Sequence, residues 1–307
     1  LPHHDSEDEP GERAMRRFVD WWRNPWGKPR FLAVFTSLYL IWSIVPILIA
    51  VRFSFNDGRS RSTGQGWSTR WYWDEPDLSV KNDPSLREAL FQSLELASLT
   101  MLIAVPIGVA LAISLTRWRG RGSGTARFVS FFPIVTPELV MGTALFLTFV
   151  HLFQFVELGT VAQLLGHVTF SISFVVIIVR GRLLSIGPEY EEAATDLGAP
   201  PMKALRLVLL PLLLPAIVAS FLIVFAISID DFVISQFLSA DSSTETIPVK
   251  IYSNARGAPT PALNALASVM LFLSLFAITA VIVLQRAMQR SRGGGKGGIE
   301  DMAQMRL

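Results

Sequence analysis

The chain has 307 residues, of which 51% are apolar and only 17% are charged. Soluble globular domains carry about 25% charged residues, so this composition is typical of a membrane protein. The 307 residues contain no cysteine, which excludes disulfide bonds and thiolate metal ligands within them, and the formal charge of +2 gives no reason to expect nucleic-acid binding. Four histidines are scattered without zinc-like spacing, at His3, His4, His151 and His167.

Apolar segments long enough to cross a bilayer recur along the chain. A crossing helix needs about 20 mainly apolar residues, and backbone groups in lipid must be hydrogen-bonded within their own segment. We therefore predict an all-α, polytopic membrane domain over residues 31–286, between a cytoplasmic tail at 1–30 without a signal-peptide pattern and a flexible, Gly-rich cytoplasmic tail at 287–307. The six predicted spans are about 31–51, 90–115, 128–149, 161–179, 212–238 and 262–284.

The basic residues predict the orientation of these spans. If the N-terminus is cytoplasmic, 19 of the 27 Lys and Arg residues fall in the inner segments and the other eight in the outer loops. Because Lys and Arg collect on the cytoplasmic side of membrane proteins, we expect both termini to lie in the cytoplasm.

The longest outer loop, about 52–89, contains the aromatic stretch GWSTRWYWDEPDLS. Amphipathic rings favour the boundary between lipid and water, so we expect these rings at the membrane interface. Contact with an incoming partner or ligand is the alternative. The rings belong to Trp67, Trp71, Tyr72 and Trp73.

A polar stretch, EYEEAATDLGAPP, lies on the predicted cytoplasmic side between two spans. Pro188 suits the first position of a helix, the glutamates that follow complement the positive end of its dipole, and Gly198 stands where a left-handed cap is wanted. A second short helix is expected to start near Pro200 or Pro201. On the first helix, residues spaced by three and four form one apolar face, at Tyr190, Ala193, Ala194 and Leu197.

The order of residues in this hairpin resembles the coupling-loop signature of ABC importer permeases. That signature reads EAA, three positions, G, nine positions, then I or V, any residue, L and P. An ordinary surface loop folded back on its own helices is the alternative interpretation. The matching residues are Glu192, Ala193, Ala194, Gly198, Val208, Leu210 and Pro211.

The resemblance implies that a hairpin at 188–211 docks into a separate ATPase dimer and passes its ATP-driven closure to the membrane helices. No GxxxxGK[ST] phosphate-binding motif occurs in the chain. We therefore expect no ATP hydrolysis, no catalytic or metal site and no cofactor in this chain, with ATP and Mg²⁺ held by the partner ATPase. The residues expected to carry coupling are Tyr190, Glu192, Ala193, Ala194, Leu197, Gly198 and Pro211.

Carboxylates inside the predicted spans are the other informative feature. A charged side chain in a span costs about 2.5–3.5 kcal/mol on insertion scales, so such residues usually face an interior or a water-filled path. Asp230 and Asp231 are expected in the outer part of the fifth span and either attract a cation or cap the helix end. Glu138 is expected near mid-bilayer beside Pro133 and Pro137, which could open a bend there.

Structural pairing with Arg180 or with a neighbouring helix is the alternative role for Glu138. Glu95, near the outer end of the second span, could reach the interface by its own length. These carboxylates, with no comparably deep Lys or Arg, predict a path for positively charged substrates, although protonation could neutralise them without any cation.

Longer segments are similar to permeases of the spermidine/putrescine type of ABC importer, specifically to the second permease of such systems. They are PELVMG, HVTFSISFVVIIVRGRL, SISIDDFVISQF and TIPVKIYSNARGAPTPALNALAS. Two departures are Ser173, where a proline is expected, and the long aromatic outer loop. The resemblance implies a type I ABC importer fold in a bacterial inner membrane, a second homologous permease and an extracytoplasmic substrate-binding protein.

The residues agree with polyamine chemistry, because ammonium groups on a methylene chain need spaced carboxylates and aromatic faces. Tyr39 and Trp42 of the first span could supply the faces, although helix packing or a lipid interface is the common fate of such rings. Three alternatives remain: the same architecture importing a metal ion, thiamine or a compatible solute; an ion-coupled secondary transporter; and a scaffold without transport.

Overall fold

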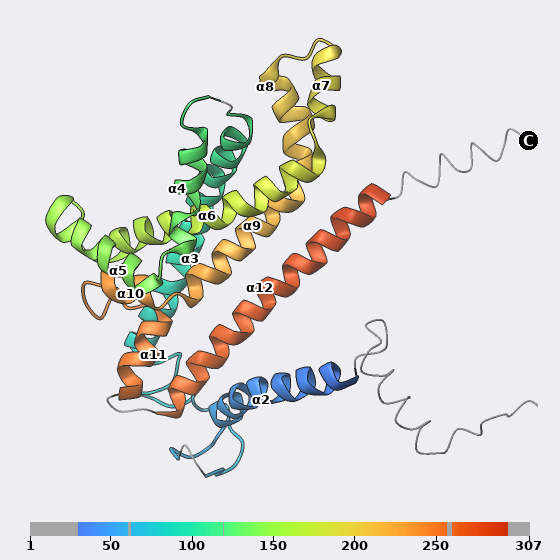
Figure 1. The fold of residues 1–307 in the computed structure, drawn as a ribbon. Helices are drawn as coiled ribbons and strands as arrows, with labels where there is room; N and C mark the ends of the chain where they lie inside the picture. Colours follow the sequence, from blue (N-terminus) through green and yellow to red (C-terminus); the bar gives the residue numbers. More distant parts are fainter. Residues whose placement is uncertain (1–29, 61–62, 119, 257–259, 294–307) are drawn as a thin grey trace, which may run out of the picture. The chain divides into compact units, whose positions relative to one another are not determined.

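The structure is a computed structural model, and it describes residues 30–60, 63–118, 120–256 and 260–293. Over these ranges the chain is helical, with no β-strand and one isolated antiparallel bridge between Asn56 and Trp67, so the predicted all-α fold is confirmed. The predictions for the two cytoplasmic tails concern residues 1–29 and 294–307, which lie outside the described residues. The helices, of which η1 and η2 are π-helical, are α2 (Arg30–Ser54), α3 (Pro84–Arg117), α4 (Ser123–Val135), α5 (Glu138–Leu147), η1 (Thr148–Leu152), α6 (Thr160–Ile186), α7 (Glu189–Asp196), α8 (Pro201–Ala204), η2 (Leu205–Leu209), α9 (Leu210–Asp230), α10 (Val233–Leu238), α11 (Ile247–Arg256) and α12 (Pro261–Gly293) (Figure 1).

Contacts divide the chain into two compact units, with the boundary between Ile49 and Ala50 inside α2. Most of α2 therefore forms one unit. The end of α2 and all later helices form the second unit, which contains all the features described below except Tyr39 and Trp42.

Five helices in the described residues are long and apolar enough to cross a membrane, and a bent pair makes up to six. The bent pair, Ser123–Val135 and Glu138–Leu152, corresponds to the predicted third span, but its two halves meet at 105°. Pro137 has no N–H to continue the helical ladder, and it stands directly before Glu138. The predicted third span is therefore a bent pair of helices, and the bend expected beside Pro133 and Pro137 is confirmed.

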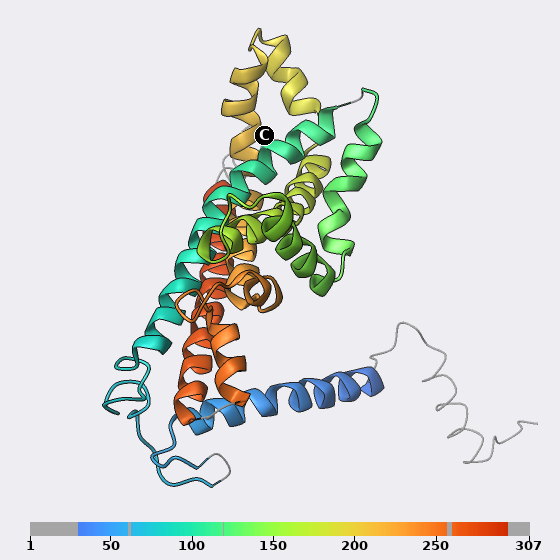
Figure 2. The ribbon, with the colours of Figure 1, turned by 90° about the vertical axis from the view of Figure 1, so that its left-hand side faces the viewer.

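The centre of the second unit is formed by α3, α6 and α9, which pack against one another (Figure 2). Small and β-branched residues allow this close packing, since Ala104 and Ala112 of α3 and Val175 of α6 are completely buried in one apolar cluster with Leu213 of α9. Burial of each larger apolar side chain contributes about 1.5–3 kcal/mol to the folded state. This cluster fixes the inner part of α9 and so the direction in which its far end points.

The short helix α10 packs against α5 and α6. Gly166 of α6 permits this approach, because a Cβ at that position would lie 2.8 Å from both Ile234 Cγ2 and Leu238 Cδ1. Both of these α10 side chains are buried. The segment after α9 therefore has a defined position in the core.

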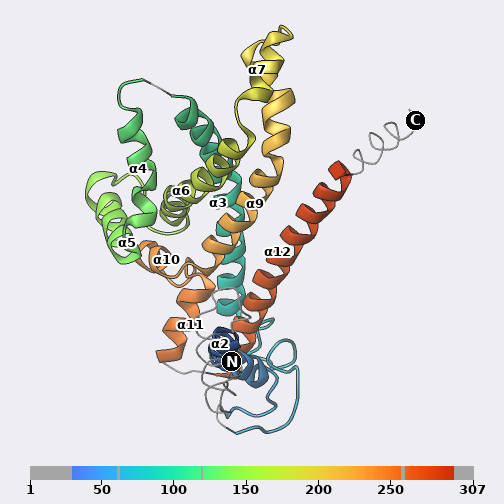
Figure 3. The same cartoon turned by 45° about the vertical axis from the view of Figure 1, so that its right-hand side comes forward.

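The long helix α3 connects two distant regions of the second unit. Its 34 residues correspond to about 51 Å at the helical rise of about 1.5 Å per residue. Residues 55–83 precede its first turn, while its last residue, Arg117, forms an ion pair with Glu191 of α7. The loop and the α7–α8 hairpin thus lie at opposite ends of α3, as the views from different sides show (Figures 1, 2 and 3).

Candidate functional site

The hairpin between α6 and α9 ends its first helix as the sequence predicts. Gly198 has a left-handed φ of +80°. Its N–H donates to Thr195 O at 2.8 Å, and the N–H of Ala199 donates to Ala194 O at 3.0 Å. These two bonds form a Schellman motif, in which glycine is favoured because it has no Cβ to strain the backbone. The predicted glycine cap is therefore confirmed, and α8 begins at Pro201 as expected.

The predicted apolar face of α7 divides into a buried and an exposed part. Ala194 is buried in the hairpin, whereas Tyr190, Ala193 and Glu192 are exposed. At the tip, the Leu197 residue is 90% exposed. This large apolar side chain is therefore not buried against any other part of the described chain.

The base of the hairpin is held to the end of α3. Arg117, in the last turn of α3, forms an ion pair with Glu191, which lies in the first turn of α7. Both charges also suit the helix ends where they stand. A cavity of about 700 Å³ lies beside this pair and is lined by Thr116, Leu183, Leu184, Pro188, Thr195 and others.

The remaining predicted coupling residue, Pro211, is exposed near the start of α9.

The two adjacent aspartates have different surroundings. Asp230 is the last residue of α9 and is exposed. The Asp231 side chain is only 6% exposed; its Oδ2 accepts a hydrogen bond from Ser235 N at 2.8 Å and lies 3.3 Å from His167 Nε2. The predicted continuous helix to residue 238 is wrong, because Asp231 is extended and its carboxylate bonds the first turn of a new helix, α10.

The other predicted path residues lie on separate helices. Glu138 is the first residue of α5 at the 105° bend, and Glu95 lies in α3; both are exposed. In the described part of the chain neither carboxylate forms a hydrogen bond or an ion pair, and neither does that of Asp230. Tyr39 and Trp42 lie in α2 with ring centroids 6.5 Å apart. Asp230 and Asp231 are adjacent in sequence, whereas Glu138 and Glu95 lie on two other helices of the second unit.

Buried polar residues within the apolar spans are the feature that sequence reasoning missed. Gln92 donates to Gln163 Oε1 at 2.8 Å, and Gln163 donates to Ser235 O at 3.1 Å and to Thr244 O at 2.9 Å. His167, which the sequence showed only as a histidine without zinc-like spacing, is hydrogen-bonded and buried. The signal available in the sequence was the presence of amide and imidazole side chains within apolar runs. Such groups are buried only with hydrogen-bonding partners, so they indicate contacts between helices.

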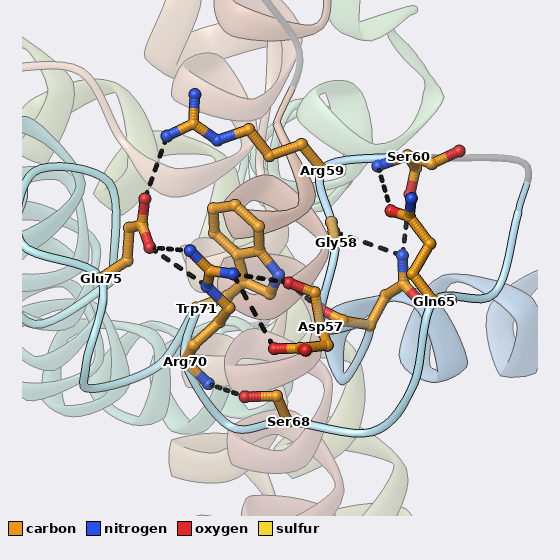
Figure 4. Close-up of polar contacts among 10 residues, drawn as sticks. Asp57, Gly58, Arg59, Ser60, Gln65, Ser68, Arg70, Trp71 and Glu75 are labelled. Atoms are coloured by element: carbon orange, nitrogen blue, oxygen red, sulfur yellow. Dashed lines mark hydrogen bonds and ion pairs between the residues drawn. The ribbon is translucent and has the colours of Figure 1, made fainter.

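The aromatic loop is a folded structure with its own small core. Trp71 is completely buried, and its indole N–H donates to Asn56 O at 2.6 Å. Glu75 accepts hydrogen bonds from Arg59 and Arg70 around this ring (Figure 4). The loop folds around Trp71, so this ring is not available for contact with lipid, while the interfacial position of the other rings stays a prediction. Trp67 and Trp73 are exposed, and the Arg52 guanidinium carbon lies 3.9 Å from the Trp67 ring centroid.

Glu75→Gln is expected to increase amide hydrogen exchange in residues 63–83 at neutral pH. Hydrogen bonds from Arg70 and Arg59 lower the pKa of Glu75 below its ordinary value of 4.5. A carboxyl whose pKa falls on folding stabilises the folded loop above the ordinary pKa, and this stabilisation is lost as pH falls through the lowered value. The wild-type loop should therefore lose protection on acidification, whereas the variant should lack this pH dependence.

Mass spectrometry of the loop peptides, labelled at several pH values with exchange times corrected for intrinsic rates, measures the effect. Asp77→Asn, at an exposed residue of the same loop, is the matched control. Equal protection of the Glu75→Gln and wild-type loops at neutral pH contradicts the role assigned to the carboxylate.

Comparison with known proteins gives one family. Residues 104–293 match the family described as "Binding-protein-dependent transport system inner membrane component". The putrescine transport system permease protein PotI of Escherichia coli (strain K12) is 34% identical over 254 residues, which cover 81% of this chain and 86% of that protein. The spermidine/putrescine transport system permease protein PotC of the same strain is 36% identical over 262 residues, which cover 85% and 94%.

A solved structure supports the same fold. The bacterial ABC transporter "involved in the import of the acidic polysaccharide alginate" aligns with a TM-score of 0.65 at 15% identity, over 91% of this chain and 99% of that chain. The family match covers more than half of the chain, and both relatives are matched over most of their length. The chain therefore belongs to the binding-protein-dependent transport system inner membrane components, as a multi-pass permease subunit of an ABC importer whose ATPase is a separate subunit.

Proposed function

We propose that this permease imports polyamines, spermidine or putrescine, as one of two homologous permeases in an ATP-driven importer. The observation that carries the proposal is the identity of 34% and 36% to permeases named for putrescine and for spermidine/putrescine transport, over most of both chains. The same fold occurs in an importer of an acidic polysaccharide, so the fold by itself does not indicate a cationic substrate.

The exposed carboxylates support a cationic substrate. Asp230, Glu138 and Glu95 are exposed and form no hydrogen bond or ion pair within the described ranges, so each is available to a mobile ammonium group. A polyamine spaces its charges along methylenes, which matches carboxylates on different helices and aromatic faces such as those of Tyr39 and Trp42. In this proposal Asp230, Glu138 and Glu95 contribute to the path, Asp231 supports the break between α9 and α10, and Tyr39 and Trp42 remain candidates for contact with the methylene stems.

The hairpin at 188–211 is proposed to dock onto an ATPase dimer that carries the ATP and Mg²⁺, with no cofactor in this chain. The exposed residues Tyr190, Glu192, Ala193 and Leu197 support this role, and the Schellman turn at Gly198 holds them on a rigid hairpin. The ion pair of Arg117 with Glu191 connects the docked hairpin to α3. Closure of the ATPase would then move α3 and α9 together.

The two ends of α3 suggest the sides on which the partners bind. The hairpin end is proposed to be cytoplasmic with both termini, in agreement with the basic residues, and the loop end is proposed to face outward. An extracytoplasmic substrate-binding protein is expected on the outer side, since the family is named for its dependence on one.

Uptake of radiolabelled spermidine by the complete importer in proteoliposomes, with its binding protein outside and ATP inside, tests the proposal. Unlabelled putrescine and spermidine should compete, whereas amino acids, thiamine, betaine and iron should not. Competition by one of the other solutes without any effect of polyamines assigns a different substrate to the same architecture. Uptake that continues without ATP but requires an ion gradient indicates a secondary transporter.

A further inference from the structure

His167 lies at the point where α9 ends and α10 begins. Its Nδ1 is 2.7 Å from Ser228 Oγ, and its Nε2 is 3.0 Å from Ser235 Oγ and 3.3 Å from Asp231 Oδ2. The His167 side chain is 1% exposed, and both serines are buried. We call these four residues, His167, Ser228, Asp231 and Ser235, the imidazole clamp.

The hydrogen-bonding roles in the imidazole clamp follow from the acceptor. An ionised carboxylate only accepts, so the imidazole nitrogen that faces Asp231 must carry the proton. In the neutral ring Nδ1 is then an acceptor, and the Ser228 hydroxyl donates to it. One ring therefore holds the last turn of α9 through Ser228, the break through Asp231 and the first turn of α10 through Ser235.

The clamp separates the roles of the two aspartates. Asp231 is turned inward, where its Oδ2 also accepts the N–H of Ser235. Asp230 precedes it at the end of α9 and is exposed, with no hydrogen bond or ion pair of its own among the described residues. Asp230 is joined directly to Asp231 at the end of α9, so holding the carboxylate of Asp231 against α6 also restrains the backbone that carries Asp230.

We propose that His167 is a positioning residue that holds the break between α9 and α10 and so directs the Asp230 carboxylate toward the transported cation. This inference rests on the proposed function in taking a polyamine as that cation. A buried polar network of this kind specifies one arrangement only while every member keeps its partners. Losing the contact to Asp231 should therefore affect Asp230 more than losing the contact to Ser228.

Two amide substitutions separate the contacts. In His167→Gln the side-chain amide reaches the position of Nε2 and keeps a donor for Asp231 and Ser235, while the Ser228 hydroxyl can bond its own helix backbone. In His167→Asn the amide reaches only the position of Nδ1. It therefore keeps the hydrogen bond with Ser228 and leaves Asp231 without a donor from this side chain. Thr169→Ala is the matched control, since Thr169 is exposed on the same helix and bonds only Leu165 O.

The first readout is spermidine uptake by the complete importer, with KM and the maximal rate measured separately. We expect KM to rise about tenfold in His167→Asn and to stay within about twofold of wild type in His167→Gln and Thr169→Ala. A purely structural role predicts instead a similar loss of assembled complex in both His167 variants, with unchanged KM in what remains. Either that result or equal KM values in both variants overturns the inference.

The second readout does not depend on the substrate. Since the chain has no cysteine, Asp230→Cys introduces a single thiol into it, and its reaction rate with a water-soluble maleimide reports the exposure at that position in the purified importer. We expect His167→Asn to change the rate by about tenfold and His167→Gln to leave it nearly unchanged. If the wild-type importer transports no polyamine, the proposed function fails, but the labelling rates still decide the role of His167. Equal labelling rates with histidine, asparagine and glutamine at position 167 reject the positioning role of His167.

Discussion

Replacing Gly198 with valine is expected to abolish ATP-driven uptake by the importer while leaving the chain inserted in the membrane. Gly198 has a φ of +80°, and L-residues adopt that region at a cost of about 1–2 kcal/mol, more when β-branched. A Cβ there meets no atom within 4 Å, so the cost arises from the backbone and not from a clash. The turn should relax and displace Leu197, so the hairpin should no longer fit the ATPase and uptake should fall to background.

Initial uptake rates and the amount of ATPase that co-purifies with the chain measure this effect. Gly181→Val is the matched control, because Gly181 lies in α6 without a left-handed φ and its Cβ direction is also open. The control should retain uptake and the co-purifying ATPase. Normal ATPase association and uptake in Gly198→Val contradicts the docking role of the hairpin.

Asp230→Asn is expected to raise the KM for spermidine uptake by about tenfold to 100-fold without reducing assembly. The carboxylate is exposed and unpaired in the described chain, so its neutralisation removes an attraction for an ammonium group and leaves no buried partner behind. Asp230→Glu should restore much of the affinity because it keeps the charge. Competition assays with putrescine and spermidine on the reconstituted importer measure both constants.

The neighbouring substitution should behave differently. Asp231→Asn removes the charged acceptor from His167 and the Ser235 N–H in a buried site, where each donor left without a partner costs about 1–3 kcal/mol, so the yield of folded complex should fall first. Asp77→Asn, in the aromatic loop, controls for a general effect of removing a negative charge. Unchanged KM in Asp230→Asn rejects this residue as a contact of the transported cation.

Features set by a few neighbouring residues were predictable from the sequence. The turn at Gly198 follows from a helix of defined length, a glycine in the cap position and prolines directly after it. The break before Glu138 follows from Pro137, although its angle of 105° depends on how α5 packs against α10. The number of spans follows from their apolar length.

Features that depend on distant partners were not predictable in the same way. The apolar pattern continues through Asp231 toward residue 238, and only the imidazole of His167, from another helix, makes a capped break favourable there. Trp71 and Trp73 are equivalent by residue type, yet the loop folds around one of them and exposes the other. The Gln92–Gln163 contact likewise joins two helices that are far apart in sequence.

The most direct test uses the absence of cysteine from the chain. Leu197→Cys places a single thiol at the exposed tip of the hairpin, and Trp73→Cys places one in the aromatic loop at the other end of α3. With a short bifunctional thiol reagent in assembled importer, the Leu197→Cys thiol should crosslink to the ATPase in a nucleotide-dependent manner, and the Trp73→Cys thiol should not. Impermeant maleimide added outside intact cells should label the Trp73→Cys thiol and leave the Leu197→Cys thiol unlabelled. Labelling of position 197 from outside, or no crosslink to the ATPase in any nucleotide state, contradicts the account.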